Sequence, residues 1–315
     1  MKTTWLAGFC FLFAAAVCYG ADIGVVTIAD GGARVLRGST WYKLVEGARV
    51  QDGDLIDAPE RAQVQVELSS GPVLNFEGPM GLLPISAGSR EVKSVAEVYL
   101  PRGWLKVAVK QGSAPLRVRT ASGAFMASDA VAVVHGDTDA IEVFVETGNG
   151  KLYEPGKVGA DGVAHDVKTG EFALRAADRP FATAGAAPLK FVGAMPRHFR
   201  DPLPARAAQY SVARVQLVAD RPISYAEAEP WLSGPYRRLF IRRLQPRLAD
   251  PEFRTAAMAK SQAYPEWQLT AAPSEPAKAE PAKPEPTKPE AAKAEAQKQP
   301  EKPASIFHWP FGEKK

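Results

Sequence analysis

The chain has almost no cysteine. Only Cys10 and Cys18 occur among its 315 residues, and both lie within the first 20. A chain that loses this leader keeps no cysteine, so it has no disulfide framework, no thiol nucleophile and no metal site built on thiolates. We therefore expect its stability to come from packing alone.

An excess of charge of one sign is also absent. The 39 Lys and Arg residues face 35 Asp and Glu residues, which leaves a net charge of +4. This balance is unsuited to a protein that wraps nucleic acid by neutralising phosphates, so we expect no nucleic-acid partner. The composition is 46% hydrophobic and 23% charged, which excludes a chain that is disordered throughout.

Long apolar runs are confined to the N-terminus. Lys2 precedes an uncharged run from Trp5 to Val17, and small residues stand at the positions that a cut after Gly20 requires. The pattern predicts a cleavable signal peptide over residues 1–20 and a periplasmic product. An uncleaved membrane anchor is the alternative, although the run is shorter than the roughly 20 residues of a spanning helix. No second segment could span a bilayer.

Residues 21–190 show apolar and polar side chains in strict alternation, which predicts half-buried β-strands. The clearest alternating runs lie at 62–68, 105–110, 116–119 and 141–146. Turn dipeptides rich in glycine separate them, such as Asp52-Gly53, Ser70-Gly71 and Ser122-Gly123. Many short strands without intervening helices predict an all-β sandwich, barrel or solenoid.

Part of this region resembles a known family. The residues that carry the resemblance are Gly32–Gly38, Leu44–Ile56 with its Gly-Asp turn, Leu100–Leu105, Leu116–Thr120 and Ile141–Gly148. Together they resemble the FecR-type periplasmic domain, over residues 23–155. Two positions depart from the family pattern: Ala58 stands where the family usually has Thr, and Ser70 where its turn usually has Asp. The resemblance implies a mainly β fold, with a FecR-type sandwich or solenoid over residues 21–190 that acts as a recognition module.

Residues 191–270 form a basic segment for which short helices are predicted near 225–233, 236–245 and 251–263. Ser224 and Glu227 have capping-box spacing, and Asp250-Pro251 is typical of a helix start. On a helical wheel, the middle helix places one apolar face opposite its arginines. The candidate partner-binding arginines are Arg238, Arg242 and Arg243.

The C-terminal part changes character twice. Residues 271–305 repeat Glu, Pro, Ala and Lys, which predicts a disordered, proline-rich linker. Residues 306–315 then form an aromatic motif with Phe307, Trp309 and Phe311. Because the linker offers no core for these rings, we expect them to bind a partner.

No catalytic, cofactor or metal site is expected. The four histidines are far apart in the sequence, without the spacing of a zinc site. Asp52, Asp54 and Asp57 lack the ligand set of a calcium loop, so they are predicted to be solvated turn residues. Trp41 and Tyr42 are predicted to pack on an edge strand.

These observations favour an exported, non-enzymatic binding or scaffolding protein of the bacterial envelope, with an envelope protein or cell-wall component as partner. The resemblance implies an alternative, a FecR-like transmembrane signalling regulator that keeps its N-terminal segment as an anchor. A further alternative is an envelope enzyme that acts on peptidoglycan or other glycans, since carboxylates are plentiful.

Overall fold

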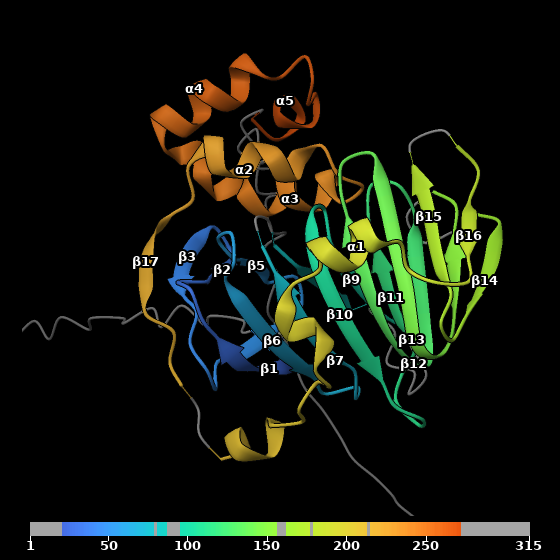
Figure 1. Ribbon diagram of the computed structural model, residues 1–315. Helices are drawn as coiled ribbons and strands as arrows, with labels where there is room; N and C mark the ends of the chain where they lie inside the picture. Colours follow the sequence, from blue (N-terminus) through green and yellow to red (C-terminus); the bar gives the residue numbers. More distant parts are fainter. Residues whose placement is uncertain are drawn as a thin grey trace, which may run out of the picture. The chain divides into compact units, whose positions relative to one another are not determined.

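The computed structural model describes residues 21–78, 81–86, 95–155, 162–176, 179–212 and 215–271 (Figure 1). These residues belong to one compact unit. The predicted signal peptide at 1–20, the aromatic motif at 306–315 and the predicted linker beyond residue 271 lie outside the described residues.

The described part of the chain is mainly β, as the alternation predicts. Its larger sheet has 13 strands, and its main path runs β16-β15-β13-β12-β10-β7-β6-β1-β4, with β8, β9, β11 and β14 attached beside it. The strands are β1 (Asp22–Ala29), β4 (Arg49–Gln51), β6 (Gln63–Leu68), β7 (Val73–Glu77), β8 (Leu83–Ser86), β9 (Ala96–Tyr99), β10 (Gly103–Val109), β11 (Leu116–Arg119), β12 (Ala124–Gly136), β13 (Ala140–Tyr153), β14 (Ala164–Lys168), β15 (Phe172–Ala176) and β16 (Ala182–Ala184). Its strand pairs are antiparallel apart from β9 with β11.

A smaller sheet has the strand order β17-β3-β2-β5 among the described residues. Its strands are β2 (Arg34–Arg37), β3 (Thr40–Lys43), β5 (Leu55–Asp57) and β17 (Ala219–Pro222). The edge-strand prediction for Trp41 and Tyr42 is wrong, because β17 arrives from the distant basic segment and pairs with β3. Trp41 is 1% exposed, because its side chain lies in a hydrophobic core.

Helices α2–α5 gather at one end of the small sheet, whereas α1 lies in front of the large sheet (Figure 1). They are α1 (Leu189–Ala194), α2 (Tyr225–Leu232), α3 (Arg237–Leu244), α4 (Pro251–Ala259) and α5 (Glu266–Ala271), with short 3₁₀ turns η1 (Arg197–Arg200), η2 (Ala207–Tyr210) and η3 (Gln245–Ala249). Helices α2, α3 and α4 lie where the sequence predicts them, whereas α1, α5 and β17 were not predicted. Among the described helices, none is long and apolar enough to cross a membrane.

Two main hydrophobic clusters hold these elements together. The first lies among the strands of the large sheet and includes Val64, Leu105 and Val143. The second joins α2–α5 to the small sheet, and we call it the shared core; it contains Leu36, Trp41, Leu55, Tyr99, Ile223, Tyr225, Ala228, Trp231, Leu232, Tyr236, Phe240, Ile241, Leu244, Phe253, Ala257 and Trp267. The helices therefore complete the interior of the β region.

The turn that carries Asp52, Asp54 and Asp57 differs from its prediction as a solvated turn. Asp54 is only 1% exposed and accepts hydrogen bonds from Arg37 Nε (3.0 Å), from Arg37 Nη2 (2.6 Å) and from the Gln51 amide (2.8 Å). Asp57 pairs with Arg34 Nε at 2.9 Å. These carboxylates serve as buried or half-buried ion-pair partners within the small sheet, and only Asp52 is exposed.

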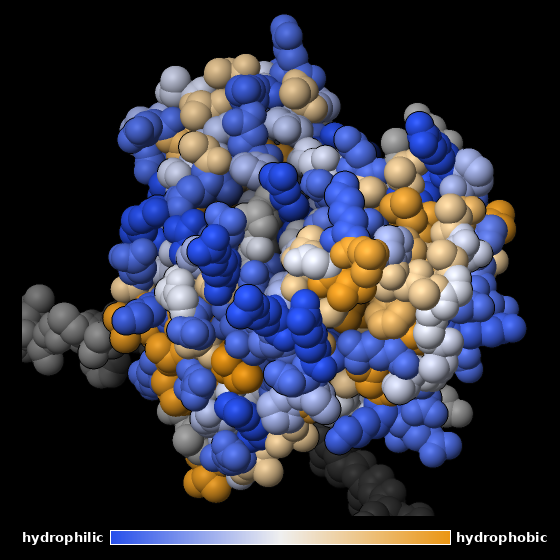
Figure 2. Space-filling view, viewed as in Figure 1, coloured by the Kyte–Doolittle hydropathy of each residue, from blue (hydrophilic) through white to orange (hydrophobic). Residues whose placement is uncertain are grey.

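The surface is mostly hydrophilic in the view of Figure 2, with an apolar patch in front of the large sheet where α1 lies. Leu189 is 90% exposed there, while Phe191 points inward and is 3% exposed. Phe191 packs against Trp104 and Phe172 and fixes α1 to the sheet face.

Candidate functional site

The candidate site is a groove between α2 and α4, and a network of charges sets the position of α2. Ser224 caps the helix and shares a reciprocal capping box with Glu227. Glu227 also accepts from Arg221 of β17 at 2.7 and 2.8 Å and from Arg34 of β2 at 2.8 Å. Two strands of the small sheet therefore hold the first turn of α2.

This network makes Glu227 strongly acidic. Hydrogen bonds from Arg221, and then from Ser224 and Arg34, hold the pKa of Glu227 well below its ordinary value despite partial burial. A depressed folded-state pKa stabilises the protein above the pKa of the unfolded state, and the stabilisation is lost as the pH falls toward the folded-state pKa.

We predict that Glu227→Gln lowers the free energy of unfolding by about 1–3 kcal/mol at pH 7, because several charge-assisted bonds and a helix cap are lost. This difference in stability should shrink when both proteins are compared at pH 3, which lies below the ordinary pKa of glutamate. Urea denaturation at the two pH values measures it. Glu229→Gln on the same helix, which breaks an exposed pair with Lys260, is the control and should cost less than about 1 kcal/mol. An equal deficit at pH 7 and pH 3 would contradict the assignment.

The opposite wall of the groove is α4, which begins at a second cap. The Asp250 carboxylate accepts from the Glu252 and Phe253 amides, and Pro251 occupies the first turn. The Phe253 amide is the main cause of a lowered Asp250 pKa, and Arg247, at 2.8 Å, contributes to it. The sequence predicted both helix starts correctly.

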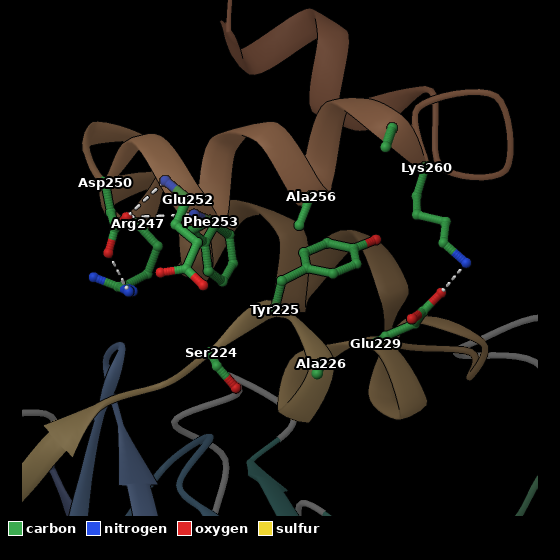
Figure 3. Close-up of a pocket in the computed structure, with 11 residues that line it drawn as sticks. Ser224, Tyr225, Ala226, Glu229, Arg247, Asp250, Glu252, Phe253, Ala256 and Lys260 are labelled. Atoms are coloured by element: carbon green, nitrogen blue, oxygen red, sulfur yellow. Dashed lines mark hydrogen bonds and ion pairs between the residues drawn. The ribbon is translucent and has the colours of Figure 1, made fainter.

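The groove encloses about 390 Å³ and has an apolar floor. The rings of Tyr225 and Phe253 meet edge to face, with centroids 5.6 Å apart, and both lie beside Trp267 of the shared core. Figure 3 shows the Tyr225 ring between the helices, below Ala256. The lining residues are Ser224, Tyr225, Ala226, Glu229, Arg247, Asp250, Glu252, Phe253, Ala256, Ala259 and Lys260. Three of them are alanines, whose small side chains leave the space open.

Opposite charges stand at both ends of the groove. Lys260 Nζ lies 3.0 Å from Glu229 Oε1 at one end, and Arg247 pairs with Asp250 at the other (Figure 3). Glu252 adds an exposed carboxylate. Burial raises the pKa of Tyr225 to about 12, so its phenol stays neutral at physiological pH. An apolar floor between charged rims suits a ligand with an apolar centre and polar flanks.

The hydroxyl of Ser224 is committed to the cap, since it donates to Glu227 Oε2 at 2.8 Å. Within the described residues, no cluster of three or more His, Cys, Asp or Glu side chains could hold a metal ion. The apolar floor and the charged rims offer a ligand apolar contact and ion pairing.

The three predicted partner-binding arginines all lie on α3 but differ in exposure. Arg238 is 88% exposed and lies 3.7 Å from Glu266, and Arg242 is also exposed. Arg243 is half-buried, and its guanidinium lies close to Gly53 in the turn before β5. Burial lowers the Arg243 pKa, against the opposing effect of Asp54 and Asp52. Arg243 is off the buried face of α3, as predicted, but the Asp52–Asp54 turn lies beside it and covers it in part.

Sequence reasoning missed the groove itself. Ser224 and Asp250 marked the two helix starts, but no local signal shows that α2 and α4 pack side by side. The other predicted site residues, Phe307, Trp309 and Phe311, lie outside the described residues.

Comparisons with known proteins define no family for the chain. No family model matches the sequence, and no curated protein matches it. Two crystal structures of a candidate anti-sigma factor from Parabacteroides distasonis are similar over 42% of this chain, with 16% and 15% sequence identity and a TM-score of 0.35. The match covers 59% of that protein, so this chain spans less than two thirds of its length. The FecR-type assignment stays a prediction.

Proposed function

We propose that the chain is an exported, non-enzymatic binding or scaffolding protein of the bacterial envelope, and that the α2–α4 groove holds a peptide segment of its partner. The observation that carries the proposal is the floor of Tyr225 and Phe253, open between alanine walls and bounded by charged rims. The N-terminal pattern of an export signal supports the envelope location.

The groove suits one kind of occupant. Its volume of about 390 Å³ holds one or two apolar side chains, and its rims offer both carboxylates and cations. A peptide that inserts an apolar side chain between charged neighbours would satisfy both features. The floor belongs to the shared core, so the site is held on packed helices and needs little ordering when it binds.

We predict that a photo-crosslinking amino acid at Ala226, which lines the groove and is exposed, captures an envelope protein in intact cells. The same group at Ala164, exposed at the start of β14, is the matched control and should not capture it. Ala259→Trp fills the groove from α4 and should reduce the capture at Ala226 at least about tenfold, while leaving the fold unchanged by circular dichroism. The captured species is identified by mass spectrometry.

Two results would overturn the proposal. One is capture of the same species at Ala226 and at Ala164, which would show that the contact is not specific to the groove. The other is capture at Ala226 that Ala259→Trp leaves unchanged, because a ligand seated on Tyr225 and Phe253 has no room beside the introduced indole.

A further inference from the structure

A second binding surface lies on the large sheet, away from the α2–α4 groove. Residues 197–206, which we call the strap, include η1 and run across the face of the sheet after α1 (Figure 1). Phe199 of the strap is fully buried against Val133, Phe172 and Phe191. Beyond Phe199, the side chains of residues 200–206 are exposed or half-buried.

Under the strap, a row of polar side chains crosses four strands. Gln65 of β6 stands opposite Asn75 of β7, and Asn75 stands opposite Lys106 of β10, so the three share one face. Thr27 of β1 extends the row, since it accepts from Gln65 Nε2 at 2.8 Å. All four residues are at most 2% exposed. Burying such a row of polar groups costs free energy unless the groups have hydrogen-bond partners.

The polar side chains of the row form hydrogen bonds to the main chain of the strap. Lys106 Nζ donates to the carbonyls of Phe199 (2.5 Å) and Asp201 (3.0 Å). Gln65 Nε2 donates to the Pro204 carbonyl at 2.8 Å. At the end of the strap, Glu67 accepts from the Arg206 amide at 2.6 Å. Because these bonds use backbone groups, the surface recognises an extended peptide with little regard to its side chains.

The strap satisfies this surface only in part. Gln65 Oε1 and Asn75 Oδ1 are buried acceptors without a hydrogen-bond partner. The segment of the strap that passes over the row contains Pro202 and Pro204, and proline has no N–H to donate. A peptide with ordinary residues at these two places could offer the missing donors.

We propose that this row, Thr27, Gln65, Asn75 and Lys106, is a binding site for an extended peptide backbone, and that the strap occupies it as a displaceable internal ligand. The ligand class is an extended peptide segment of a partner protein that carries N–H groups where the strap has its prolines. The strap opens locally because Phe199 is its one fully buried aromatic anchor among the described residues and most of its other side chains face solvent.

The test uses the full chain in which Phe199, the buried side chain that holds the strap on the sheet, is replaced by alanine. Phe199→Ala should release the strap, and a fluorescent peptide with the sequence of residues 195–207 should then bind with saturable anisotropy, whereas it should not bind the unaltered protein. The same peptide with Pro202→Ala and Pro204→Ala should bind about tenfold more tightly, because its two added N–H groups reach Gln65 Oε1 and Asn75 Oδ1. Adding Gln65→Leu to the Phe199→Ala protein should weaken binding at least about tenfold.

Three results would overturn the proposal: no peptide binding to a folded Phe199→Ala protein, binding that Gln65→Leu leaves unchanged, or equal affinity of the two peptides. Hydrogen exchange on the unaltered protein keeps the idea testable if Phe199→Ala does not fold. The Arg206 amide should exchange at least about a hundredfold faster than the paired amides of β6 and β10. Equal protection would mean that the strap opens only on global unfolding, and the site would then be closed to any partner.

Discussion

Trp41→Ala is expected to lower the free energy of unfolding by about 3–5 kcal/mol, which is among the largest effects for a single substitution. Trp41 is 1% exposed on the central strand β3 and lies in the shared core with Leu36 and Leu55. The guanidinium of Arg34 lies 4.0 Å from its ring centroid. Removing the indole opens a cavity where the small sheet meets the helices, so both should weaken together.

Urea denaturation followed by tryptophan fluorescence and by the helical circular dichroism signal measures this effect. The two transitions should coincide and move together in Trp41→Ala, because one core joins strands and helices. Lys43→Ala on the same strand, where the side chain is exposed, should change stability by less than about 0.5 kcal/mol. A helical transition that stays in place while the fluorescence transition moves would show that the helices fold independently.

Trp41→Phe provides a finer check of the same site. Trp41 Nε1 is buried without a hydrogen-bond partner, so phenylalanine removes an unpaired donor together with part of the ring. We therefore expect this variant to retain most of the stability that alanine loses.

The strands were predictable because their signal is local. Alternation over 105–110 and 141–146 depends on neighbouring residues, and the structure has β10 and β13 there. The strand β17 has the sequence Ala-Asp-Arg-Pro, which carries no alternation and no strand propensity. Its pairing with β3, far away in the sequence, makes it a strand.

Alternation also shows which side chains share a face, but not what covers that face. Lys106 alternates with Leu105 and Val107 and was assigned to the polar side of a half-buried strand. It is 1% exposed, because the strap lies over that side. Asp54 was misjudged for the same reason, since its partner Arg37 comes from another strand.

Of the candidate groove, only the starts of its two helices were predictable from the sequence. The capping signals at Ser224 and Asp250 specify where two helices begin, because a cap is a contact within three residues. The contacts of Tyr225 with Phe253 and Trp267 join residues 28 to 42 positions apart. Contacts of this kind depend on the tertiary fold, which explains why the groove appears only in the structure.

The second large effect is expected at the ion pair under the strap. Lys106 Nζ lies 2.9 Å from Glu146 Oε2 of β13 and also bonds the Phe199 and Asp201 carbonyls. Lys106→Met keeps the length of the side chain and removes its charge. We expect a loss of about 3–5 kcal/mol, since the buried Lys106 ammonium is the donor to the half-buried Glu146 carboxylate and to two strap carbonyls. Chemical denaturation measures the loss of stability. The rate of trypsin cleavage after Arg200 under native conditions shows how firmly the strap is held.

The double variant Lys106→Met/Glu146→Leu separates the ion pair from the strap bonds. Removing Glu146 takes away the uncompensated charge, so the double variant should regain at least about 1 kcal/mol relative to Lys106→Met. Its strap should nevertheless remain more sensitive to trypsin than in the unaltered protein, because the Phe199 and Asp201 carbonyls still lack Nζ. Glu60→Gln, an exposed carboxylate in the turn before β6, is the matched charge control and should change stability by less than about 0.5 kcal/mol. A double variant as resistant to trypsin as the unaltered protein would mean that Lys106 stabilises the sheet and does not hold the strap.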